Sequence, residues 1–136
     1  MNDLVTIDWG KLPTRRELQS QLNRINLSAD AKLALYNLSE MTYRVGDKIV
    51  DIGRRILAFV MELVRKFPNI TIAVLAAIVI SALIGSVALL GPLLQALLGP
   101  LVVAAAVGFG TLAEMREGHL GLSVDWLTRE IEALVK

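Results

Sequence analysis

The longest uncharged stretch of the chain runs for 47 residues, from Phe67 to Ala113. As a single helix it would be about 70 Å long, at 1.5 Å per residue. The hydrocarbon core of a bilayer is only about 30 Å thick and is crossed by roughly 20 residues. The stretch therefore predicts two transmembrane helices, and the chain must reverse direction inside it.

The sequence offers two places for this reversal, Gly91-Pro92 and Gly99-Pro100. Reversal at the first pair leaves two arms, residues 70–90 and 93–113, each long enough to cross a bilayer. Reversal at the second pair would leave a second arm of about 14 residues, which is too short. We therefore predict a hairpin turn at 91–92 and a kink at 99–100, where the proline removes a helix hydrogen bond.

Small and polar residues indicate how these helices could pack. Small residues at helical spacing let helices approach closely in lipid, and here they are Ala73, Ala77, Ser81 and Gly85 in the first span and Ala104 and Gly108 in the second. Candidate polar groups for an interface or a pore lining are Ser81, Ser86 and Gln95. Gln95 falls one turn past the predicted reversal, at the far interface, which weakens a pore-lining role.

The N-terminal region, residues 1–67, is predicted to consist of an extended segment over 1–13, a short helix over 14–26 and a long helix over 28–67. Trp9 could anchor the extended segment on a partner. Thr14 and Glu17 form a capping box that opens the short helix. Ser28 is a suitable N-cap for the long helix.

The predicted long helix carries apolar residues in alternating steps of three and four, which is the pattern of a helix-packing seam. The seam comprises Leu35, Leu38, Thr42, Val45, Ile49, Ile52, Ile56, Phe59 and Leu63. Gly46 and Gly53 lie beside it, and we interpret them as places where another helix approaches closely. On the other face, Asp51 and Arg55 are spaced for an ion pair within the helix.

Residues 114–136 are predicted to form a C-terminal amphipathic helix with Ser123 as N-cap and Trp126 bordering its apolar face. Positive charge before the first span places its start in the cytoplasm; the residues are Arg54, Arg55, Arg65 and Lys66. With two spans, both termini are then cytoplasmic. The expected fold is therefore all-α: an integral membrane hairpin flanked by amphipathic helices.

The sequence contains no cluster of residues that would support catalysis. There is no cysteine, and His119 is the only histidine, in a glycine-flanked segment. Without these groups, a metal site or a nucleophile with its base cannot be assembled from recognised spacings. We expect no enzyme activity, no metal and no cofactor, and the net charge of +1 does not favour nucleic acid.

An apolar hairpin between amphipathic helices is similar in layout to the insertion hairpin of pore-forming colicins and to small phage holins. The leading hypothesis is a non-enzymatic membrane protein that forms a homo-oligomer through its hairpin and binds a partner through its cytoplasmic helices. The alternative is a pore or channel former of holin-like or toxin-like type. A third alternative hides the hairpin in the protein's own core, where roughly 70 amphipathic residues must cover 47 apolar ones.

Overall fold

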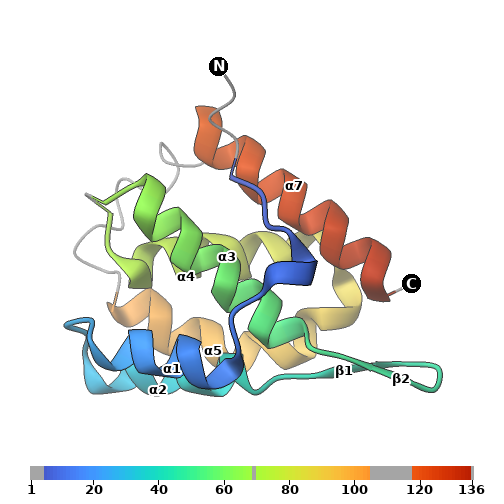
Figure 1. Ribbon diagram of the computed structural model, residues 1–136, viewed down its shortest axis with the longest axis horizontal. Coiled ribbons are helices and arrows are strands. Elements are labelled where there is room, and N and C mark those ends of the chain that lie inside the picture. The colour runs from blue at the N-terminus through green and yellow to red at the C-terminus, as the bar shows by residue number, and fades with distance from the viewer. Residues whose placement is uncertain (1–4, 69, 105–117, 136) are drawn as a thin grey trace.

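The computed structural model describes residues 5–68, 70–104 and 118–135 (Figure 1). These residues are mostly helical, consistent with the all-α expectation. The helices are α1 (Arg15–Asn23), α2 (Ala29–Ser39), α3 (Ile52–Lys66), α4 (Ile72–Ser86), α5 (Gly91–Ala104) and α7 (Gly118–Val135). Two short 3₁₀ helices, Trp9–Lys11 and Ala88–Leu90, and a hairpin of β1 (Tyr43–Val45) and β2 (Lys48–Val50) complete the fold.

Side-chain caps begin the first two helices where the sequence predicts them. Thr14 accepts a hydrogen bond from the backbone N–H of Glu17, whose carboxylate accepts one from the N–H of Thr14. This reciprocal pair satisfies two of the N–H groups that a helix start leaves without partners. Ser28 accepts from the N–H of Ala31 and begins α2 in the same way.

The long helix predicted over 28–67 is wrong, because residues 40–51 leave it. β1 and β2 pair antiparallel, with Tyr43 opposite Val50 and Val45 opposite Lys48. The two-residue turn between them needs a positive φ at its first position, which glycine provides. Gly46 has a φ of 61° and is the only residue with a positive φ among those described. α2 ends at Ser39, and the hairpin that this turn closes separates α2 from α3.

The reversal in the apolar stretch lies earlier than the sequence predicts. α4 ends at Ser86, and Val87 leaves the helical conformation with φ −118° and ψ 84°. Gly85 and Ser86 are weak helix formers, and the buried side chains of Val87 and Leu90 fix the corner in the core. The predicted turn at 91–92 is therefore wrong, because those residues already belong to α5.

The prolines of α5 occupy two different helical environments. Pro92 lies in the first turn, where its missing N–H removes no helix hydrogen bond. Pro100 lies inside α5, which continues through it to Ala104.

The helices form three layers around α4 (Figure 1). α2 packs against α5 on one side, α3 and α4 lie together in the middle, and α7 contacts α3 and α4 from the other side. Residues 5–11 run between α3 and α7, and the β1–β2 hairpin projects from the helices. One hydrophobic core includes side chains of α1–α5 and α7.

Candidate functional site

The central helix α4 is apolar around its circumference. From Ile72 to Leu83, every residue except Ser81 is buried. Thr71 begins the helix by accepting a hydrogen bond from the N–H of Val74. A helix that is hydrophobic on all sides is found in a protein core or in a membrane.

No single helix among the described residues is both long and apolar enough to cross a membrane. α4 meets that requirement only together with residues 88–102, from which it is bent by 117°. At 1.5 Å per residue, the 15 residues of α4 span about 22 Å, less than the hydrocarbon thickness of about 30 Å.

α5 has one buried face and one exposed face, and neither carries a charged residue. Its buried side chains are Leu94, Leu97 and Leu101. The exposed residues are Pro92, Leu93, Gln95, Ala96 and Gly99, to which Leu89 adds a side chain that is 59% exposed. We call this group the apolar edge, since Gln95 is its only polar member. A helix at the surface of a water-soluble protein normally turns charged residues to the outside, so this edge is unusual.

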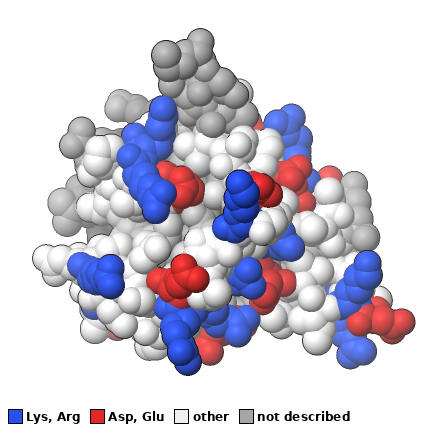
Figure 2. All heavy atoms as spheres, viewed as in Figure 1, with Lys and Arg blue, Asp and Glu red and all other residues white. Residues whose placement is uncertain are grey.

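The helices that cover α4 are amphipathic. α3 buries Ile52, Ile56, Phe59 and Leu63, and α7 buries Leu120, Val124, Leu127, Ile131 and Val135. Charged residues lie on their outer sides. Figure 2 shows that Lys and Arg are interspersed with Asp and Glu on the viewed face, so no large patch of one sign forms there. The covering helices thus present a solvated surface, whereas the α4–α5 pair contributes no charge.

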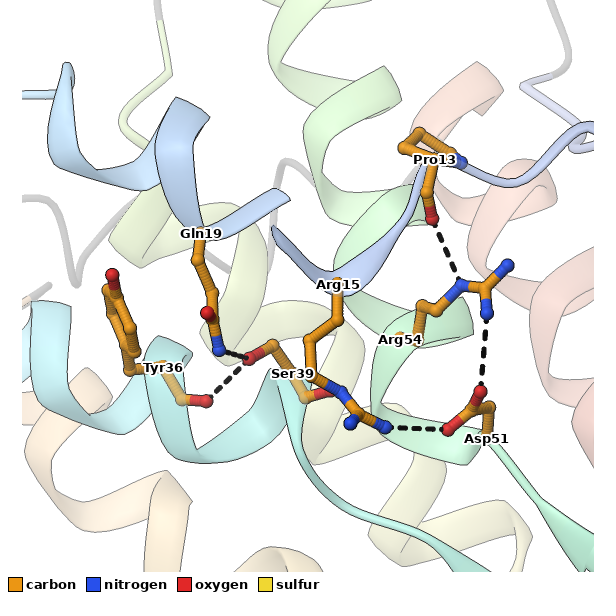
Figure 3. A network of polar contacts seen from close by, with 7 residues as sticks. All are labelled: Pro13, Arg15, Gln19, Tyr36, Ser39, Asp51 and Arg54. Atoms are coloured by element: carbon orange, nitrogen blue, oxygen red, sulfur yellow. Dashed lines mark hydrogen bonds and ion pairs between the residues drawn. The ribbon is translucent and has the colours of Figure 1, made fainter. Parts of the chain in front are cut away.

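A carboxylate joins the starts of α1 and α3 (Figure 3). Asp51 accepts from Arg15 at 2.9 Å through one oxygen and from Arg54 at 3.3 Å through the other. Arg54 also donates to the carbonyl of Pro13 at 3.0 Å. The predicted pairing of Asp51 with Arg55 is not what forms, because the Asp51 carboxylate binds Arg15 and Arg54 and the guanidinium of Arg55 lies over Trp9. About one third of each carboxylate and guanidinium is exposed, so each pair contributes about 1 kcal/mol or less.

Ser39, at the end of α2, ties α1 and α2 together beside this carboxylate. Its hydroxyl is buried; it donates to the carbonyl of Tyr36 at 2.6 Å and accepts from Gln19 at 2.9 Å. Arg15 donates to the carbonyl of Ser39 at 2.9 Å. The buried hydroxyl and the carbonyl of Ser39 are therefore both paired, and the network fixes α1 relative to α2 (Figure 3).

Three aromatic rings connect the N-terminal segment, α7 and α3. Trp9 stacks on Trp126 with centroids 5.7 Å apart and an interplanar angle of 20°. Trp126 in turn stacks near Phe59, at 6.0 Å and 24°. We call these rings the aromatic column. Such pairs contribute about 0.5–1.5 kcal/mol each beyond the area they bury, so the column stabilises the position of α7.

The guanidinium of Arg55 lies over the ring of Trp9, with Cζ 5.0 Å from the centroid. This geometry is that of a cation–π contact. The Nε and Nη1 atoms of the same side chain are buried and lack a hydrogen-bond partner in the described part of the chain. A buried charged donor without a partner opposes folding, whereas the cation–π contact with Trp9 favours it.

The structure separates the residues of the predicted packing seam. Leu35 and Leu38 are buried in α2, and Ile52, Ile56, Phe59 and Leu63 are buried in α3. Thr42, Val45 and Ile49 belong to the segment that connects α2 to α3 in the sequence. Ile49 lies on the hairpin, and its side chain is 72% exposed. The seam is therefore two core faces that meet within one chain, as α2 and α3 pack together.

The two glycines beside the seam have different roles. Gly46 forms the hairpin turn and has no neighbouring atom within 4 Å of a Cβ built on it. A Cβ at Gly53 would lie 1.6 Å from the carbonyl oxygen of Leu38. Gly53 also donates its N–H to the carbonyl of Met41 at 3.0 Å. The close approach at Gly53 is thus made to the end of α2 in the same chain.

The small and polar residues predicted in the apolar stretch fall in two groups. Ala73 and Ala77 are buried inside the protein, whereas Ser81, Gly85, Ser86 and Gln95 are exposed. Ser86 lines a surface hollow of about 300 Å³ together with Leu89 and residues of α7, and Gln95 does not belong to its lining. Ala104 ends α5, and Gly108 lies outside the described residues.

Sequence reasoning missed the partner of Trp9, which is α7 of the same chain. Spacing within one segment carries no information about such a long-range contact. The alternation of Val5, Ile7 and Trp9 gives the segment an apolar side. Trp126, at the border of the apolar face of the last helix, is the signal in the sequence for a surface on which that side could pack.

Comparison of the chain with protein-family models, with curated proteins and with solved structures finds no match. Within residues 5–68, 70–104 and 118–135, no three His, Asp or Glu side chains are grouped to hold a metal ion. His119 falls at the start of α7, and its side chain is not among those described.

Proposed function

We propose that this protein is a non-enzymatic helical protein whose α4–α5 pair inserts into a lipid bilayer. In the compact form, α3 and α7 pack on α4, and α2 packs on α5. In the inserted form, the uncharged residues 70–90 and 93–113 lengthen the two helices until each crosses the hydrocarbon core. Both termini then remain on the cytoplasmic side.

The observation that carries the proposal is the apolar edge of α5. A core helix in a water-soluble protein buries its apolar face and exposes charge, but α5 exposes Leu93, Ala96 and Gly99 with no charged neighbour on the helix. The bend at Val87 supports the proposal as well, since a break between α4 and α5 allows the pair to rearrange without breaking either helix. Residues of α4 and α5 that are buried in the compact form exchange protein contacts for lipid contacts, so these two helices expose little apolar area to water on insertion.

Self-association in the bilayer is part of the proposal. Ser81 and Gly85 are exposed on α4, and Ala96 and Gly99 are exposed on α5. Small residues of this kind permit close helix contact in lipid, where van der Waals packing drives association. The solvated outer faces of the amphipathic helices are then free to bind a protein partner in the cytoplasm.

A binding experiment with liposomes tests the proposal. Ser81 is exposed in the compact form and lies near the middle of the proposed span 70–90, so Ser81→Lys leaves the fold intact but places a charge in the hydrocarbon core of the inserted helix. A lysine near the middle of a membrane helix costs about 2.5–3.5 kcal/mol, which corresponds to a loss of roughly 100-fold in partitioning. The matched control is Ala133→Lys on α7, where the residue is also exposed.

The wild-type protein and Ala133→Lys are expected to float with liposomes of phosphatidylcholine and phosphatidylglycerol, whereas Ser81→Lys is expected to stay at the bottom of the gradient. Flotation of all three proteins alike, or of none, contradicts insertion of the α4–α5 pair.

A pore former is the second candidate, favoured by the exposure of Ser81, Ser86 and Gln95. In a ring of copies these polar groups would face an aqueous path. Release of a dye trapped in the same liposomes separates the two functions: a pore former releases dye at protein amounts that bind, whereas an anchor binds without release. Gln95→Leu should reduce release in the first case.

A further inference from the structure

The N-terminal segment is attached to α7 at two points, two helical turns apart. The N–H of Val5 donates to the Ser123 hydroxyl at 2.8 Å in a buried contact. The indole Nε1 of Trp9 donates to the carboxylate of Glu130 at 3.0 Å. We call residues 5–11 the strap. In Figure 1 the strap lies along α7 and passes between that helix and α3.

The strap binds α7 and also links α7 to α3. Trp9, Trp126 and Phe59 form the aromatic column, so the indole of the strap extends a stack that begins on α3 and runs through α7. On the α3 side, the ring of Trp9 also lies over the guanidinium of Arg55. Removing the strap would therefore take away one end of the column and two hydrogen bonds to α7.

α7 in turn covers α4. Its buried side chains, Val124, Leu127, Ile131 and Val135, belong to the same core cluster as the residues of α4. Since α7 contacts α4 and α3 directly, a movement of α7 away from α3 would expose one side of the most apolar helix in the protein.

Arg55 acts on the closed position of the strap in two ways: its cation–π contact with Trp9 favours closure, whereas its two buried donors without a partner oppose it. Its Nε and Nη1 atoms are buried without a hydrogen-bond partner in the described residues, and the indole of Trp9 lies over the guanidinium. A guanidinium loses hydration when it is buried, and partners that complete its hydrogen bonds normally compensate for the loss. When the strap leaves, water regains access to this side chain.

We propose that the strap is a latch that holds α7 over α4, and that Arg55 keeps this latch reversible. Trp9, Ser123, Glu130 and the aromatic column favour the closed state, and the unpaired donors of Arg55 favour the open one. Opening uncovers α4 before any other helix moves. The link from opening to membrane insertion rests on the proposed function; the latch itself does not.

Hydrogen exchange of the full chain, measured by mass spectrometry, tests the latch. Local opening raises amide exchange only in the part that opens. Trp9→Ala is expected to raise exchange in peptides of α7 at least tenfold, while peptides of α1 and α2 stay at wild-type rates. Tyr36→Ala, which removes a half-buried aromatic ring of α2 that is not part of the column, is the matched control and should leave α7 unchanged.

Arg55→Met keeps the length and apolar stem of the side chain but removes the buried charge. It is expected to slow exchange in α7 relative to the wild type. Unchanged or faster exchange in this variant would overturn the role assigned to Arg55. An unchanged α7 in Trp9→Ala would overturn the latch, as would an equal rise in all helices, since the strap would then support the whole core.

Liposome flotation of the same variants separates the latch from the proposed function. If Trp9→Ala opens α7 and also speeds binding to the liposomes, both are supported. If α7 opens and binding does not change, the latch is retained and insertion through the α4–α5 pair is contradicted.

Discussion

Replacing Gly53 by alanine is expected to destabilise the protein by about 2 kcal/mol. A Cβ there would lie 1.6 Å from the Leu38 carbonyl oxygen and 2.9 Å from the Cβ of Met41, whereas ordinary contacts between heavy atoms are about 3.5–4.0 Å. The oxygen belongs to the backbone of α2, so the first turn of α3 must move. Overpacking of this kind costs about 3 kcal/mol at the upper end of its usual range. The better helix propensity of alanine offsets about 1 kcal/mol of this loss in stability.

Two other glycines serve as controls because the structure predicts different outcomes for them. Gly85 is exposed in α4 with no atom within 4 Å of a built Cβ, so alanine should stabilise the protein by up to about 1 kcal/mol. Gly46 also has free space but a φ of 61°, so alanine there should cost about 1–2 kcal/mol. A continuous helix over 28–67 would predict the opposite sign at Gly46.

Urea unfolding followed by far-UV circular dichroism measures all three variants, with changes in the midpoint converted through a common slope. The expected order of stability is Gly85→Ala, wild type, Gly46→Ala and Gly53→Ala. A Gly53→Ala protein at least as stable as the wild type would refute the close approach of α3 to α2. A more stable Gly46→Ala protein would refute the hairpin.

Three further substitutions test other parts of the fold by the same unfolding assay. Thr14→Ala removes the capping box of α1 and should cost about 1 kcal/mol, and an unchanged midpoint would show that the cap does not contribute. Asp51→Asn weakens the pairs to Arg15 and Arg54; it should cost about 1 kcal/mol at low salt and less at high salt, since partly exposed pairs are screened. Leu75→Ala removes a fully buried side chain of α4 and should cost about 2–5 kcal/mol; a smaller loss would mean that α4 is not in a packed core.

Local signals in the sequence predicted the parts of the fold that depend on neighbouring residues. The capping box at Thr14 and the N-cap at Ser28 both lie where the helices begin. The all-α class followed from the apolar periodicity. α5 begins at Gly91, two residues before the predicted start at 93, and Pro92 lies in its first turn, where proline is common.

The hairpin at residues 43–50 was missed although its signal was present. Tyr43-Arg44-Val45 and Lys48-Ile49-Val50 alternate around Gly46-Asp47, which is a two-residue hairpin pattern. The same apolar residues also fit steps of three and four, and this longer pattern favours a continuous helix over 28–67. The positive φ at Gly46 decides between them, and a residue pattern does not report a dihedral angle.

The start of α7 and the corner at Val87 depend on tertiary packing. Ser123 was predicted as the N-cap of the last helix, but α7 begins at Gly118 and uses the Ser123 hydroxyl to accept from Val5. At the corner, the burial of Val87 and Leu90 outweighs the turn preference of Gly91-Pro92. The contacts of Trp9 with α7 likewise join residues more than a hundred positions apart, which local reasoning does not reach.

The order of the helices along the chain has a consequence for synthesis. α1–α3 leave the ribosome before α4, so part of the cover, including the network around Asp51, exists when the apolar helix emerges. α7 follows roughly 50 residues later, which at about 5–20 residues per second takes several seconds. During that interval α4 has one side protected and one side bare, without α7 and its contacts to the strap. The apolar helix of a nascent chain is therefore least covered in the seconds before the last helix is made.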